Sequence, residues 1–200
     1  MANAVLNGHV PLAGERREVS ILFQDIRGFT TISERTDPAV LVCMLNQFFT
    51  EMVAAVEAEG GVVKQFTGDG VMALFGAPNV YPDSAARAVR AALGMAHRLA
   101  SLNERLHQQG FPDLRIGVGI HTGEVVAGLI GPDKRVEYAV VGDPVNLASR
   151  IEGLTKELQA TIVISETTAS RLGPEVKLGR TATMSVKGKE KPVTVVEVLV

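Results

Sequence analysis

The sequence contains no tryptophan, only one cysteine, and few aromatic residues, which make up 4% of the 200 residues. The single cysteine, Cys43, excludes an internal disulfide framework and suits a reducing compartment, so we expect a cytoplasmic protein. Hydrophobic residues nevertheless amount to 46% and are spread along the chain, which predicts one domain with a full but aliphatic core.

The chain also lacks an excess of charge of either sign. Its formal net charge is −2, which argues against a nucleic-acid partner, because such proteins normally present a basic face. We expect no apolar run long enough to span a bilayer, and therefore no membrane contact by this segment, although a longer parent protein could be membrane-bound. Any anion binding must then be local.

Hydrophobic periodicity and turn residues predict a flexible arm over residues 1–14 and a single domain over residues 15–200. Strands are predicted over residues 19–23, 62–66, 71–75, 114–120, 125–130, 136–141, 161–164, 182–186 and 193–198, with a turn at 121–123. Helices are predicted after Pro38 until Gly60, after Pro82 until about Gln109, from Asp143 to about Glu152, and over 166–172. This order predicts an α+β fold, a ferredoxin-like βαββαβ core with C-terminal additions.

Two carboxylates lie where apolar strands end. Asp25 follows the first strand, and Asp69 lies in the glycine-flanked turn of the predicted hairpin. Because the first strand neighbours the hairpin in such a core, we expect the two side chains to converge and to bind divalent cations such as Mg²⁺. The alternative is that Asp69 is only a turn former and Asp25 only a strand-end acid.

Two further segments have features of an anion site. Gly28, Phe29 and Thr30 are predicted to begin a helix, where free backbone N–H groups can bind phosphate, although a glycine after a strand is usually just a turn. Asn146 and Arg150 are four residues apart and share one face near a helix N-terminus. Arginine can clamp phosphate oxygens and asparagine can orient a hydroxyl, whereas the alternative is a solvated helix face.

Together these segments resemble the catalytic domain of class III nucleotidyl cyclases, the adenylate and guanylate cyclase family. The resemblance extends from about residue 17 to residue 200. It rests on five ordered motifs: FQDIRGFT (23–30), GDGVMALFG (68–76), GIHTG (119–123), GDPVNLASR (142–150) and VKG (186–188).

The resemblance implies a head-to-tail homodimer that uses two divalent cations, Mg²⁺ or Mn²⁺, and has its active sites at the interface. Three residues of one subunit would bind the metals: Asp25, Ile26 (through its carbonyl) and Asp69. Asn146 and Arg150 of the other subunit would hold the ribose and the transition state, and Lys187 would contact the triphosphate. The implied reaction is attack of the ribose 3′-hydroxyl on the α-phosphorus with release of pyrophosphate, driven by positioning and charge stabilisation.

Two positions of the base pocket depart from the adenylate cyclase pattern. Gln65 stands where the base-reading lysine is usual, and Ala139 where an aspartate or threonine is usual. Lys64 is one residue away and is expected to point to the opposite face of its strand. We therefore expect an adenylate cyclase acting on ATP, with two alternatives: a cyclase of guanine or relaxed preference, or a cyclase-like regulatory or dimerisation module. The regulator and the dimer affinity stay open.

Overall fold

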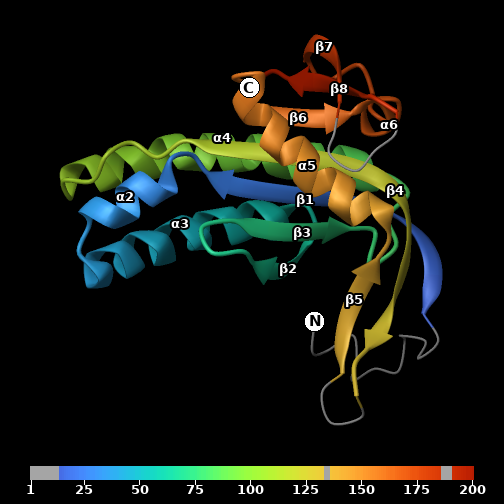
Figure 1. The fold of residues 1–200 in the computed structure, drawn as a ribbon, viewed down its shortest axis with the longest axis horizontal. Helices are drawn as coiled ribbons and strands as arrows, with labels where there is room; N and C mark the ends of the chain where they lie inside the picture. The colour runs from blue at the N-terminus through green and yellow to red at the C-terminus, as the bar shows by residue number, and fades with distance from the viewer. Residues whose placement is uncertain (1–13, 133–135, 186–190) are drawn as a thin grey trace.

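The computed structural model describes residues 14–132, 136–185 and 191–200 (Figure 1). In chain order, its strands and helices are β1 (Glu15–Ile26), α2 (Phe29–Arg35), α3 (Pro38–Ala58), β2 (Val62–Phe66), β3 (Val71–Phe75), α4 (Ser84–Gln108), β4 (Ile116–Ile130), β5 (Glu137–Val141), α5 (Asp143–Glu157), β6 (Ile162–Ser165), α6 (Glu166–Ala169), β7 (Leu178–Met184) and β8 (Val193–Val198). Of the predicted arm only Gly14 is described, and the remainder lies outside the described residues.

One sheet organises the molecule, with the strand order β2-β3-β1-β4-β6-β8-β7 and with β5 paired to β4 outside this path. The pairs β2–β3, β3–β1 and β1–β4 are all antiparallel. With α3 between β1 and β2 and α4 between β3 and β4, this is the ferredoxin-like βαββαβ arrangement, which confirms the predicted fold class. Strands β6, β8 and β7 are the C-terminal additions.

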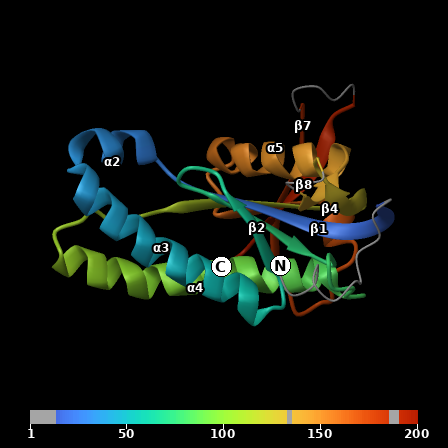
Figure 2. The same ribbon diagram turned by 90° about the horizontal axis from the view of Figure 1, so that it is seen from below.

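Helices cover both faces of the sheet (Figure 2): α3 and α4 lie on one face and α5 on the other. Alternate residues of β1 contact the two layers, because successive side chains of a strand point to opposite faces. Leu22 and Ile26 belong to the core beneath α3 and α4, whereas Val19 and Ile21 pack on the α5 side. Asp25 shares the α5 side by this alternation.

Helix α3 corrects one sequence prediction. Its length and mean hydropathy of 1.7 are sufficient for a membrane span, so the expectation that the chain contains no such run is wrong. Length and composition alone also describe a core helix. In this fold Met44, Phe48 and Met52 of α3 are fully buried, while Val42 on the opposite side is exposed.

Strand β4 corrects a second prediction. We expected two strands separated by a turn at 121–123, but β4 is one continuous strand of 15 residues. It pairs with β1 from Glu15↔Ala127 to Ile26↔Ile116, and this long-range pairing overrides the local turn signal. His121 is buried, and its Nδ1 lies 2.8 Å from the Ser165 Oγ, a structural contact.

Smaller differences concern the ends of elements, which sequence patterns define poorly. Strand β1 begins at Glu15, four residues before the predicted strand, and α5 continues to Glu157. Gly142 is the N-cap of α5, and Asp143 is its first helical residue. The predicted helix over 166–172 ends at Ala169, and the predicted strand over 182–186 is observed as β7, Leu178–Met184.

Candidate active site

The structure brings Asp25 and Asp69 together, as predicted. Strand β3 pairs with β1 up to Gln24↔Val71, so the turn between β2 and β3 lies beside the end of β1. Gly70 makes this approach possible, because a Cβ atom there would lie 2.3 Å from the Gln24 carbonyl oxygen and 3.0 Å from Asp25 Oδ1. The glycine after Asp69 is therefore required by the contact between hairpin and strand, and not only by the turn.

The two carboxyl groups interact strongly. Burial, the negative charge of Asp69, a hydrogen bond to Asp69 and the charge of Glu152 raise the pKa of Asp25 to about 7, and a backbone hydrogen bond at Ile26 opposes them. Two carboxylates this close repel each other when both are ionised, and a cation between them removes that cost. The electrostatics of the pair therefore fit a cation site.

The donor chemistry fits a hard divalent cation. Asp25, Asp69 and the Ile26 carbonyl offer only oxygen ligands, which Mg²⁺ and Mn²⁺ accept. Within residues 14–132, 136–185 and 191–200, no group of three or more His, Cys, Asp or Glu side chains forms a metal cage. Mg²⁺ is commonly bound by one or two protein carboxylates and completes its coordination shell with water and substrate phosphates, so this pair of carboxylates suits it.

The segment Gly28–Thr30 begins α2, as predicted. Gly28 is the N-cap with φ 68°, and its carbonyl accepts hydrogen bonds from the N–H groups of Thr31 and Ile32 at 3.1 and 3.3 Å. No side chain caps this end of α2 in the part of the chain that is described. Phe29 packs against the core and Thr30 is exposed, so the donors available to a phosphate here are the backbone N–H groups and the Thr30 hydroxyl.

A cavity of about 120 Å³ joins the end of β1 to helix α5. Its lining comprises Asp25, Ile26, Arg27, Gly28, Glu152, Gly153 and Lys156. The charged members Arg27, Glu152 and Lys156 were not among the site residues predicted from the sequence. The spacing of Gly117 and Gly119, two residues apart on one strand, was the available signal that a helix lies close to this strand.

These glycines allow α5 to lie directly on β4. A Cβ atom at Gly119 would lie 2.1 Å from the backbone nitrogen of Glu152, and one at Gly117 would lie 2.9 Å from Glu152 Oε1. Burial raises the pKa of Glu152, and the charges of Arg27 and Lys156 oppose this shift. Arg27 is fixed through its Nη2, which donates to the Ala160 carbonyl at 2.9 Å.

Asn146 and Arg150 lie one turn apart on α5, Asn146 exposed and Arg150 half-buried. Neither lines the cavity that contains Asp25, and the groups that shift the Asp25 pKa are Asp69, Glu152 and Ile26. Within one chain, the structure therefore does not bring the asparagine and the arginine into the site of the two aspartates. Lys187 lies outside the described residues.

Near the positions predicted to read the base, Gln65 and Ala139, the direction of the Lys64 side chain differs from the expectation. The β2–β3 register shifts between Val63 and Gln65, so Lys64 is the extra residue of a β-bulge, where the alternation of side chains is interrupted. Lys64 Nζ lies 3.9 Å from Glu137 Oε2 of β5. Ala139 shares a face of β5 with Glu137, so the expectation that Lys64 points away is wrong. Gln65 is exposed.

Comparison with known proteins agrees with this geometry. The family model described as "Adenylate and Guanylate cyclase catalytic domain" matches residues 13–197. Adenylate cyclase 1 of Rhizobium meliloti is 36% identical over 94% of this chain, which spans only 28% of that relative's length.

Two solved structures share the fold with a TM-score of 0.86 each. The guanylyl cyclase Cya2 is 40% identical, over 92% of this chain and 93% of its own. The adenylyl cyclase CyaB from P. aeruginosa is 32% identical, over 93% and 95%. With its converging aspartates and its matching fold, the chain belongs to the family of adenylate and guanylate cyclase catalytic domains.

Proposed function

We propose that this chain is an adenylate cyclase domain that converts ATP to 3′,5′-cyclic AMP and pyrophosphate. The observation that carries the proposal is the convergence of Asp25 and Asp69, with an Asp25 pKa raised to about 7, in a member of this family. Such a pair fits a centre for two divalent cations, Mg²⁺ or Mn²⁺. When bound, the ions supply activation of the attacking oxygen and neutralisation of phosphate charge.

The residues of this chain bind the ions and the phosphates. Asp25, Asp69 and the Ile26 carbonyl hold the ions, and backbone N–H groups at Gly28, Phe29 and Thr30 hold the phosphates. The ribose 3′-hydroxyl releases its proton to solvent and its oxygen forms a bond to the α-phosphorus, while the bond from this phosphorus to pyrophosphate breaks and pyrophosphate leaves. Positioning and charge stabilisation supply most of the rate.

We place Asn146 and Arg150 of a partner subunit at the same site, which requires a head-to-tail homodimer. The support is that these two side chains lie on α5 outside the cavity that holds Asp25 in their own chain. A guanidinium one turn from an amide can bind phosphate oxygens while the amide orients the ribose. Lys187 of the late turn is proposed to contact the triphosphate.

GTP is the second candidate substrate, and two observations favour it. Gln65 and Ala139 replace the usual adenine-reading pair, and Cya2, a guanylyl cyclase, is 40% identical to this chain. The Rhizobium meliloti relative and CyaB support ATP. Lys64, turned toward β5 by the bulge, can offer the ammonium group that Gln65 lacks. We therefore retain ATP as the proposed substrate, and a purely regulatory module is the outcome if neither nucleotide is converted.

A product assay tests this proposal. The purified chain is incubated with ATP or GTP, and with Mg²⁺ or Mn²⁺, across a range of protein concentrations. We expect cyclic AMP, rising faster than linearly with protein concentration because the active form is a dimer, and no turnover by Asp25→Ala with an unchanged circular dichroism spectrum. Cyclic GMP as the main product would show that GTP, and not ATP, is the preferred substrate. No cyclic product from either nucleotide, at concentrations where dimers are verified, would contradict both.

A further inference from the structure

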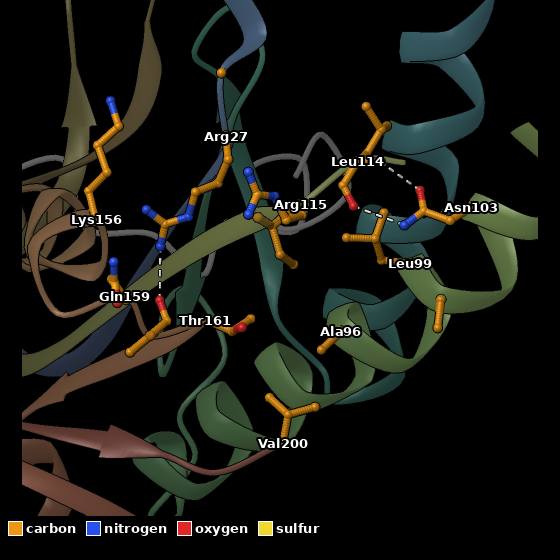
Figure 3. Close-up of a pocket in the computed structure, with 14 residues that line it drawn as sticks. Arg27, Ala96, Leu99, Asn103, Leu114, Arg115, Lys156, Gln159, Thr161 and Val200 are labelled. Carbon is orange, nitrogen blue, oxygen red and sulfur yellow. Dashed lines mark hydrogen bonds between the residues drawn. The ribbon is translucent and has the colours of Figure 1, made fainter. Parts of the chain in front are cut away.

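A larger cavity, of about 830 Å³, is shown in Figure 3. It shares Arg27, Gly28 and Lys156 with the cavity that holds Asp25. Helix α4, the beginning of β4, the segment between α5 and β6, and Val200 enclose it. Its volume falls in the range typical of pockets for small organic molecules. Of the residues proposed above to hold the nucleotide or the metals, Gly28 alone is in the described lining of this cavity.

Three cationic side chains line it: Arg27, Arg115 and Lys156. The described lining includes no aspartate or glutamate. Glu152 faces Arg27 and Lys156 from the smaller cavity. The side of the cavity formed by Arg27, Arg115 and Lys156 therefore carries an excess of positive charge that an anion would neutralise.

The wall opposite these cations is apolar. Ala96 and Leu99 of α4 form it together with Ile116 and Val200. The one amide in this wall, Asn103, is already satisfied: its Nδ2 donates to the Leu114 carbonyl and its Oδ1 accepts from the Leu114 N–H, both at 2.9 Å. The cavity thus pairs a cationic side with a hydrocarbon side, as Figure 3 shows for Arg27, Arg115 and Leu99.

We propose that this cavity binds an amphipathic carboxylate, with its head group at Arg27, Arg115 and Lys156 and its aliphatic body along α4. A guanidinium binds a carboxylate through two parallel hydrogen bonds. Each methylene group that is buried against the apolar wall adds to the free energy of binding. Arg27, Gly28 and Lys156 line both cavities, so the bound molecule is an effector placed beside the proposed active site. Its effect on turnover rests on the proposed function, whereas its binding does not.

Calorimetric titration of the full chain with decanoate, below its micelle concentration and without nucleotide, tests the binding. We expect one saturable site for decanoate and none for decyltrimethylammonium. Arg115→Gln should weaken binding about tenfold, because a hydrogen bond to a charged group is lost. Ala100→Trp, which fills the cavity from an exposed position of α4, should abolish binding.

Two matched variants control for non-specific effects. Lys177→Gln removes an exposed cation outside the cavity, and His97→Trp adds an indole to α4 outside it, so both should bind decanoate like the parent chain. Equal affinity of the parent chain and Ala100→Trp, with both shown to be folded by circular dichroism, would overturn the proposal. So would equal affinity of the parent chain for decanoate and 1-decanol.

Sedimentation with phosphatidylglycerol vesicles separates a free carboxylate from a lipid head group. The chain should remain in the supernatant, and pelleting with the vesicles would contradict a free ligand.

Discussion

At the scale of single residues, Gln24 combines deep burial with an unsatisfied amide. It precedes Asp25 on β1, is 1% exposed, and lies on the same side of the strand as Leu22 and Ile26. Neither Gln24 Oε1 nor Nε2 has a hydrogen-bond partner among the described residues. A buried polar group without a partner costs about 1–3 kcal/mol.

Replacing this amide with an apolar side chain of similar size should therefore stabilise the protein. We expect Gln24→Met to raise the free energy of unfolding by about 1–3 kcal/mol, measured by urea denaturation. Gln108→Met, at an exposed position of α4, is the matched control and should leave stability unchanged. A loss of stability in Gln24→Met alone would show that the amide has a partner, such as a buried water.

The raised pKa of Asp25 makes stability depend on pH. Its value of about 7 in the folded state exceeds the ordinary value of 3.8, so the folded state binds more protons than the unfolded state between these limits. The free energy of unfolding should therefore fall as the pH rises from 3.8 to about 7 in the presence of a chelator.

The variant Asp25→Asn removes this contribution. Urea denaturation at several pH values should show a shallower decline for Asp25→Asn than for the parent chain, and added Mg²⁺ should restore stability to the parent chain at high pH. An identical pH dependence of the two proteins would contradict the raised pKa of Asp25.

At the scale of elements, structure that follows from adjacent segments or from the order of strands was predicted correctly, whereas structure set by the pairing or packing of distant segments was not. The hairpin was predicted with its observed bounds, Val62–Phe66 and Val71–Phe75, because the Asp-Gly turn and the flanking apolar runs are adjacent in sequence. The turn predicted at 121–123 was wrong, because pairing with β1 decides the course of β4.

The same distinction holds in the candidate site. The proximity of Asp25 and Asp69 follows from the order of strands, so the sequence predicted it. The position of Glu152 depends on how closely α5 packs on β4, and the bulge at Lys64 depends on the β2–β3 register. The bulge has no local sequence signal, and Gly117 and Gly119 indicate only that a helix lies close to β4, not which side chain it brings there.

The packing of α5 on β4 gives a prediction at this scale. Gly119→Ala should destabilise the protein by about 3 kcal/mol, because the new methyl group would meet the backbone of Glu152 and displace the helix. Gly153→Ala is the matched control: a Cβ atom there has no neighbour within 4 Å, and alanine favours helix, so stability should be kept or raised. Thermal unfolding followed by circular dichroism measures both. Equal melting temperatures of the two variants would contradict the close packing of α5.

At the scale of the whole molecule, one chain supplies only part of the proposed site. Asp25 and Asp69 meet at the end of β1, whereas Asn146 and Arg150 lie on α5 outside that cavity. The chain also exposes apolar side chains on its β4–β5 arm, where Val126, Ile130, Val136 and Val141 are 44%, 50%, 43% and 54% exposed. Such a patch is typical of a protein–protein contact and suits a second copy of this chain.

The most direct test of a site shared between two chains is complementation. Asp25→Ala and Arg150→Ala chains are each assayed alone and then as an equimolar mixture, with mixed dimers verified by differential tagging. We predict that each variant alone is inactive and that the mixture recovers about one quarter of the parent activity, because half of randomly formed dimers are mixed and each contains one intact site of two. Verified mixed dimers without activity, or full activity of Arg150→Ala alone, would contradict a site built from both chains.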